Sequence, residues 1–207
     1  MPIALPKQTM NAQEFDFLWK RNFPKSSPLP HLFRQDYSSD WIRIKSLPGT
    51  KRYPTNDKDI ETLLERQNAV ITEVLGNNTQ VFGITGEYDF DRDQTLPRYL
   101  KTQPFQKFTF VPIHPINMYE ISRSEFKQGD LYQPYLTELV WTNGAFNDLL
   151  EAIAYDEARM FFMSVERKCL VAPYDGGIDL IISDREQYLF LADKFKEWMA
   201  PSISQKV

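Results

Sequence analysis

Residues 40–75 have the sequence DWIRIKSLPGTKRYPTNDKDIETLLERQNAVITEVL, which holds the clearest structural pattern in the chain. At its start, two isoleucines alternate with larger or charged residues, Ile42 and Ile44 with Trp41, Arg43 and Lys45. Alternate side chains of a strand point to opposite faces of its sheet. The pattern therefore predicts a strand with one face in the core and one face that is cationic and aromatic.

A loop and a long helix follow this predicted strand. The loop, residues 46–54, places Lys51, Arg52 and Tyr53 close to the cationic face. After the loop, apolar residues recur at the 3.6-residue spacing of an amphipathic helix over residues 57–75. We expect the apolar side of this helix to pack against the core.

Apolar residues at helical spacing predict three further helices. Asn11 is placed to cap the first of them, and Ser183 with Glu186 has the spacing of a capping box for the last. The predicted bounds are residues 11–21, 145–159 and 183–199. Three prolines between residues 24 and 30 instead predict an extended connector.

Strands are predicted singly and as hairpins between these helices, without a regular β-α alternation. Residues rich in β-branched and aromatic side chains, bounded by turns, mark them at 79–88, 108–116, 135–141, 160–165, 168–174 and 178–182. This order predicts an α+β fold with a mainly antiparallel sheet of about six strands. We expect three to four helices to cover one face of that sheet.

The composition is that of a folded domain. Of 207 residues, 42% are hydrophobic and 14% are aromatic, which is enough apolar surface for a substantial core. The length fits one domain, so we predict a single domain over residues 1–207. Residues 1–10 contain two prolines and no periodic pattern, and we expect them to form a loose tail.

Charge and cysteine content indicate a compartment. The only cysteine, Cys169, lies in an apolar run and has no second thiol to pair with, which is typical of a reducing environment. The chain does not start with a basic segment followed by an apolar one, and it has no apolar run of about 18 residues. We therefore expect a soluble cytoplasmic protein without membrane contacts. A net charge of −4 makes nucleic acid an improbable partner.

Two blocks of this sequence resemble a family of small bacterial proteins known as a domain of unknown function. The family shares a W-x-R-x-x-S-L-P-x-x-K-R-Y core, a helix ending near R-x-N and a later P-Y-D-x-G-x-D segment. The matching residues are Trp41, Arg43, Ser46, Leu47, Pro48, Lys51, Arg52, Tyr53, Arg66, Asn68, Tyr174, Asp175, Gly177 and Asp179. The resemblance implies a single bacterial cytoplasmic domain, and it implies no particular activity.

The cationic residues of the first block allow two interpretations. Arg43, Lys51 and Arg52 can bind a phosphate or carboxylate, with Trp41 and Tyr53 stacking on a ring beside it. Alternatively, Arg43 or Arg52 pairs internally with a carboxylate of the second block, Asp175 or Asp179, and locks the loop to the C-terminal hairpin. The two interpretations are compatible with each other.

Other chemistries find little support in the sequence. Asp175 and Asp179 can hold a metal, but a turn with glycine at positive φ explains the same segment. His31 and His114 are far apart in sequence and lack the ligand spacing of a zinc site. A Ser-His-Asp triad stays open, because its members are recognised by geometry. The chain contains no G-x-S-x-G, Walker, G-x-G-x-x-G or H-E-x-x-H motif, so we expect no catalytic residues, no metal and no cofactor.

Two functions follow from these features. The first is a non-catalytic bacterial binding protein of the immunity or antitoxin type, which contacts a partner protein such as a toxin. The second is an enzyme or ligand-binding domain that holds an anionic small molecule with Arg43, Lys51, Arg52 and Tyr53. The second predicts a concave pocket lined by these residues, with Asp175 or Asp179 at its rim.

Overall fold

A computed structural model describes residues 10–49, 51–88 and 96–199 of the chain. The tail predicted for residues 1–10 lies outside these ranges except for Met10. Met10 is partly buried and packs against a core cluster. None of the helices in the described ranges has the length and apolar character needed to cross a membrane.

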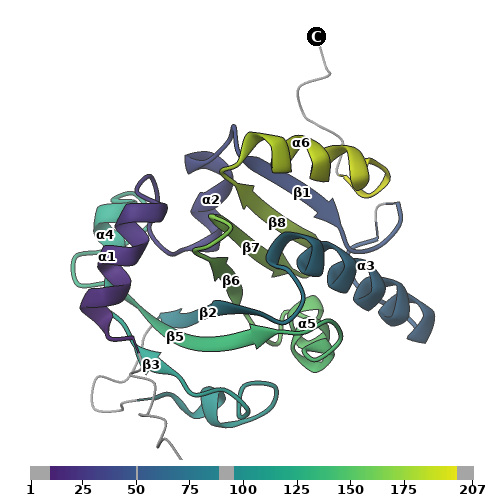
Figure 1. The fold of residues 1–207 in the computed structure, drawn as a ribbon. Coiled ribbons are helices and arrows are strands. Elements are labelled where there is room, and N and C mark those ends of the chain that lie inside the picture. The colour runs from purple at the N-terminus through teal and green to yellow at the C-terminus, as the bar shows by residue number, and fades with distance from the viewer. Residues whose placement is uncertain (1–9, 50, 89–95, 200–207) are drawn as a thin grey trace, which may run out of the picture.

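The fold is an antiparallel sheet with helices packed on it, which confirms the predicted α+β class (Figure 1). Eight strands form one sheet, and every pairing in it is antiparallel. Their order across the sheet is β1 (Trp41–Lys45), β8 (Gly177–Ile182), β7 (Cys169–Tyr174), β6 (Phe161–Ser164), β2 (Thr79–Tyr88), β5 (Leu131–Trp141) and β3 (Val111–Pro112), with β4 (Ile116–Asn117) also on β5.

The sheet has more strands than the six expected. The single strand predicted over residues 108–116 is interrupted, and only the two-residue strands β3 and β4 pair with β5. Pro112 and Pro115 lack the N–H that a continuous ladder needs, so the edge of the sheet here is formed in short pieces.

Six α-helices and two short 3-10 helices complete the described chain. Their bounds are α1 (Ala12–Asn22), α2 (Pro30–Asp36), α3 (Asp57–Leu75), α4 (Met118–Ile121), α5 (Asn147–Ala154), α6 (Arg185–Lys194), η1 (Arg98–Lys101) and η2 (Lys196–Trp198). Asn11 caps α1, as expected, and Asn56 caps α3. The α6 cap differs from the prediction, because Asp184 and not Ser183 accepts the N–H of Gln187.

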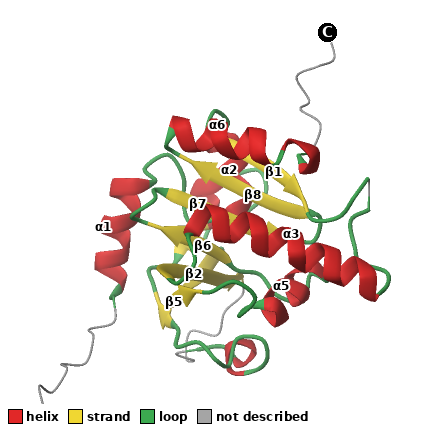
Figure 2. Ribbon diagram, turned by 45° about the vertical axis from the view of Figure 1, so that its right-hand side comes forward, coloured by secondary structure: helices red, strands yellow, loops and turns green. Residues whose placement is uncertain are grey.

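Helices cover both faces of the sheet, so the expectation of a single covered face was wrong. On one face α3, α5 and α6 pack over a large cluster that includes Ile42 and Ile44 of β1 (Figure 2). On the other face α1 and α2 pack over a second cluster around Trp19 and Phe33. Residues 24–29, most of the connector predicted as extended, form turns and bends, and α2 begins at Pro30, in the first helical position, where a missing N–H costs nothing.

Candidate functional site

The cationic face of β1 is paired across the sheet with a carboxylate. Arg43 lies directly opposite Asp179 in the register of β1 and β8. Its Nε donates to Asp179 Oδ1 and its Nη2 donates to Oδ2, both at 2.7 Å. These hydrogen bonds raise the pKa of the Arg43 guanidinium, against the opposing effect of its partial burial. The predicted internal pairing of Arg43 is therefore confirmed.

Aromatic rings enclose the same guanidinium group. The Arg43 guanidinium carbon lies 5.1 Å from the ring centroid of Trp41 and 5.0 Å from that of Tyr174. Arg34 of α2 lies 4.8 Å from the Trp41 centroid. Two arginines thus already stack on Trp41. The ring is occupied by the protein's own cations and is poorly placed to stack on a ligand.

A second carboxylate of the hairpin holds the loop. Arg52 Nε donates to Asp175 Oδ2 at 2.7 Å, its Nη2 lies 2.7 Å from the same oxygen, and the Tyr53 hydroxyl donates to it at 2.8 Å. The Asp175 side chain is 9% exposed, whereas that of Arg52 is 64% exposed. Tyr53 is also exposed. One almost buried carboxylate therefore fixes two side chains that remain accessible to a partner.

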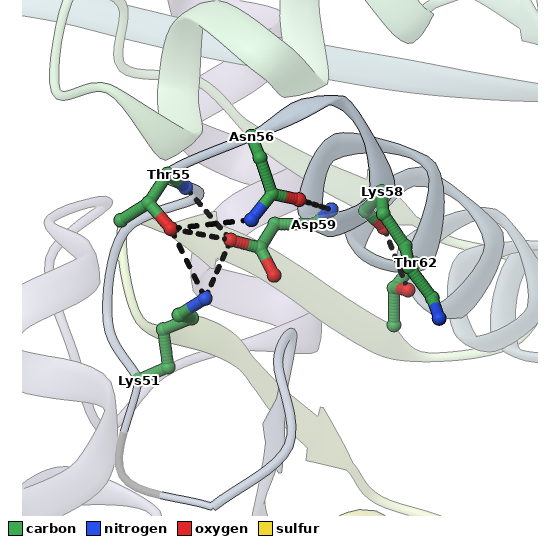
Figure 3. Close-up of polar contacts among 6 residues, drawn as sticks. All are labelled: Lys51, Thr55, Asn56, Lys58, Asp59 and Thr62. Atoms are coloured by element: carbon green, nitrogen blue, oxygen red, sulfur yellow. Dashed lines mark hydrogen bonds and ion pairs between the residues drawn. The ribbon is translucent and has the colours of Figure 1, made fainter.

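Lys51 belongs to a different group of contacts, at the start of α3 (Figure 3). Its Nζ lies 2.6 Å from Asp59 Oδ2 and donates to the Thr55 hydroxyl at 3.1 Å. Asp59 also accepts the backbone N–H of Thr55 at 2.8 Å. These bonds lower the pKa of Asp59 to about 2, and the bond from Lys51 has the largest effect. The predicted cluster is thus divided: Arg43 and Arg52 pair with carboxylates of the β7–β8 hairpin, and Lys51 pairs with a carboxylate of α3.

The base of the loop is anchored in the core. Ser46 and Leu47 are buried, and the amide of Gln67 in α3 donates to the Ser46 hydroxyl at 2.8 Å. The backbone N–H of Ser46 donates to the carbonyl of Gly176 in the hairpin at 3.4 Å. The loop is therefore held at its base by α3 and the hairpin, and farther along by Asp175.

The Asp175–Asp179 segment fits neither of the two interpretations of its sequence, a metal site or a turn with glycine at positive φ. Its two carboxylates bind different arginines, and the described residues contain no group of three His, Cys, Asp or Glu side chains that could hold a metal. Gly176 and Gly177 are not among the positive-φ glycines. Gly177 is needed for a steric reason, because a Cβ there would overlap the carbonyl oxygen of Ile44 in β1.

A cavity of about 580 Å³ lies beside the hairpin. Arg52 and Asp175 line it, as the pocket hypothesis requires, but Arg43, Lys51 and Tyr53 do not. Its other walls come from the ends of β2, β5 and β7, from the α5–β6 connection and from residues 29–31 at the start of α2. They include Tyr88, Tyr132, Arg159, Phe161 and Tyr174, none of which the sequence singled out as a pocket residue.

The remaining nucleophiles and bases do not assemble into a reactive group. His114 Nδ1 lies 2.6 Å from Asp16 Oδ2, and both histidines line a second cavity of about 870 Å³ between α1, α2 and α4. No serine hydroxyl in the described ranges hydrogen-bonds to His114, so the triad left open by the sequence is incomplete there. Burial raises the pKa of the Cys169 thiol to about 12, which leaves it protonated at neutral pH.

Gly177→Ala should destabilise the protein. The added Cβ meets backbone of β1, which cannot move without breaking the β1–β8 ladder, so we expect a loss of about 1–3 kcal/mol and a melting temperature lower by at least about 2 °C. Gly176→Ala is the control, because its Cβ meets only side chains, the Tyr174 ring closely and Arg52 at an ordinary contact distance, and these can shift. Equal melting temperatures for the two variants would contradict this steric explanation.

The Asp59 contacts predict an acid-dependent contribution to stability. The folded pKa of about 2 is lower than the ordinary value of 3.8, so ionised Asp59 stabilises the fold above pH 3.8, and this contribution is lost as the pH falls through about 2. Asp59→Asn should melt below the wild type at pH 5 to 7, and the difference should close near pH 2. Melting curves recorded over that range test this, and a difference independent of pH would refute it.

The comparisons with known proteins agree with the resemblance of the two sequence blocks. A family model described as Domain of unknown function (DUF3885) matches residues 29–202. Searches of curated proteins and of solved structures gave no match. The matched range contains β1, the loop, α3 and the hairpin that carries both carboxylates. This chain belongs to the DUF3885 family.

Proposed function

We propose that this chain is a non-catalytic binding protein of the immunity or antitoxin type, which contacts a partner protein through Arg52 and Tyr53. One observation carries the proposal. The nearly buried Asp175 carboxylate binds both side chains and leaves both exposed. A loop held in this way presents a surface whose shape is set before a partner arrives.

The energetics of binding favour such a surface. Ordering flexible side chains during association costs about 0.5–1.5 kcal/mol for each one, and a fixed side chain avoids much of that cost. Arginine and tyrosine are also among the residues that contribute most at protein interfaces. The Arg52 guanidinium uses only Nε and Nη2 for Asp175, so it retains N–H donors for a partner.

The neighbouring residues support contact more than turnover. Arg43 is paired with Asp179 and enclosed by rings, and Cys169 is buried and protonated. We also place the protein in the bacterial cytoplasm in this proposal, because a chain with a single cysteine has no structural disulfide to maintain. A toxin with an acidic or hydrogen-bond-accepting patch is the partner that fits Arg52 and Tyr53 best.

Co-expression with the product of the adjacent gene tests this function. We expect a stable complex, and we expect Arg52→Ala and Tyr53→Ala each to weaken it about tenfold or more by calorimetry. Asp175→Asn should weaken it too, because it releases both side chains. Arg185→Ala, which removes an exposed arginine from α6, is the matched control. The proposal fails if no neighbouring product binds, or if the loop variants bind like the wild type.

A second candidate is a binding site for an anionic small molecule at Arg52. It is favoured by the cavity that Arg52 and Asp175 line together with Tyr174. Under this alternative, millimolar phosphate or a small dicarboxylate should raise the melting temperature of the wild type and leave that of Arg52→Ala unchanged. An equal response of both proteins would remove the candidate.

A further inference from the structure

Strand β2 is longer than the strand beside it. It pairs with β5 over its whole length, from Thr79 to Tyr88, but it pairs with β6 only at residues 82–84. On the β6 side, no strand of the described residues lies next to residues 85–88. This part of the sheet is an open edge inside the fold.

The register shows which backbone groups face that edge. Ile113 donates its N–H to the Pro134 carbonyl at 3.1 Å, so this carbonyl points toward β3 and away from β2. Pro134 lies opposite Gly86. In an antiparallel pair, two opposite residues either form both hydrogen bonds with each other, or the backbone N–H and C=O of both residues point away from the partner strand. The N–H and C=O of Gly86 therefore point toward the open edge, and those of Tyr88, two residues on, do the same.

The open edge forms part of the wall of the 580 Å³ cavity. Residues 85–88 line it together with Arg159, Phe161 and Tyr174. Thr85 reaches across it with its side chain, whose hydroxyl donates to the Arg159 carbonyl. No loop or side chain in the described ranges is hydrogen-bonded to the backbone N–H of Gly86 or Tyr88. Two backbone donors and two acceptors thus face a space large enough for another chain.

We propose that an extended segment of a partner protein adds to β2 as a further strand, pairing with Gly86 and Tyr88 inside this cavity. The inference rests on the proposed function, that the chain binds protein, and it names how the partner is held. The exposed groups of Gly86 and Tyr88 are about 7 Å apart along the strand, a repeat that the backbone of another strand matches. Strand addition of this kind obtains its affinity from main-chain hydrogen bonds.

The side chains around the edge define the sequence that fits. Tyr88 and Tyr132 form an aromatic wall on one face of the sheet, with ring centroids 4.9 Å apart. Glu87 points to the opposite face, is partly buried and has no ion pair or hydrogen bond within the described chain. Adjacent residues of an added strand point to opposite faces. We therefore expect an apolar or aromatic residue against the tyrosines and, next to it, a lysine or arginine near Glu87.

The charges of the cavity agree with a basic segment. Arg52 pairs with Asp175 and Arg159 pairs with Asp156, so each of these two carboxylates has a cationic partner. Among the charged residues that line the cavity, Glu87 is the carboxylate without an ion pair in the part of the chain that the structure describes. A lysine or arginine of the added segment would form an ion pair with the Glu87 carboxylate.

The first experiment uses a phage-displayed library of random twelve-residue peptides as the probe. Wild-type protein should select peptides with adjacent apolar and basic residues. Backbone N-methylation of a selected peptide should abolish binding at alternate positions only, because alternate N–H groups face β2. Glu87→Gln should weaken these peptides about tenfold. The inference is wrong if no peptide is selected, or if N-methylation is tolerated at every position.

The second experiment removes the edge donor from the protein. Tyr88→Pro deletes an N–H that does not belong to the β5 ladder, and Tyr88→Ala is the matched control that loses the ring and keeps the N–H. We expect Tyr88→Pro to bind selected peptides at least about tenfold more weakly than Tyr88→Ala. Equal affinities would overturn the inference.

Glu87→Pro should melt well below Tyr88→Pro, because the Glu87 N–H faces β5. If Tyr88→Pro does not fold, the N-methylated peptides decide the question on wild-type protein.

The two proposals can fail separately. If Arg52→Ala and Tyr53→Ala weaken the complex with the adjacent gene product but Tyr88→Pro binds it like Tyr88→Ala, the proposed function stands and strand addition is wrong. If peptides bind at the edge while no neighbouring product binds, strand addition stands and the proposed partner class is wrong.

Discussion

Two nearly buried carboxylates on one hairpin constrain the rest of the structure. Asp175 and Asp179 lie at the end and in the middle of the β7–β8 pair, where water cannot solvate them well. A buried ion pair contributes little net stability, but removing one partner costs about 3–5 kcal/mol, because the remaining buried charge is then neither paired nor solvated by water. Two arginines must therefore lie beside this hairpin. That requirement fixes β1 through Arg43 and the following loop through Arg52.

The two pairs have different consequences because their arginines differ in exposure. The Arg43 side chain is 29% exposed and stacked between rings, so its pair serves the packing of β1 against β8. Arg52 stays largely in solvent, where an ion pair adds little to stability. Arg52 instead compensates the charge of the nearly buried Asp175. In turn, Asp175 holds the exposed side chains of Arg52 and Tyr53 in one arrangement.

The sequence predicted the parts of this site that depend on local periodicity. Alternation in residues 41–45 and helical spacing in residues 57–75 each involve only neighbouring residues, and both elements form as expected. The pairing of Arg43 with Asp179 depends on a strand register between residues 136 positions apart. The sequence therefore could not show which of the two arginines pairs with which of the two aspartates. The open edge of β2 could not be predicted at all. It exists because β6 is six residues shorter than β2, and relative strand lengths matter only once the strands are paired.

Asp175 connects the exposed loop to the cavity. Its carboxylate holds Arg52 and Tyr53 on the surface, and the same carboxylate and Arg52 also line the cavity that contains the free edge of β2. A partner segment paired with Gly86 and Tyr88 would therefore leave the cavity close to Arg52. Contact at the loop and pairing at the edge then act as two parts of one interface, and the second contact forms at the high effective concentration created by the first. In that arrangement, neutralising Asp175 affects both contacts, although its side chain is too buried to form much of either.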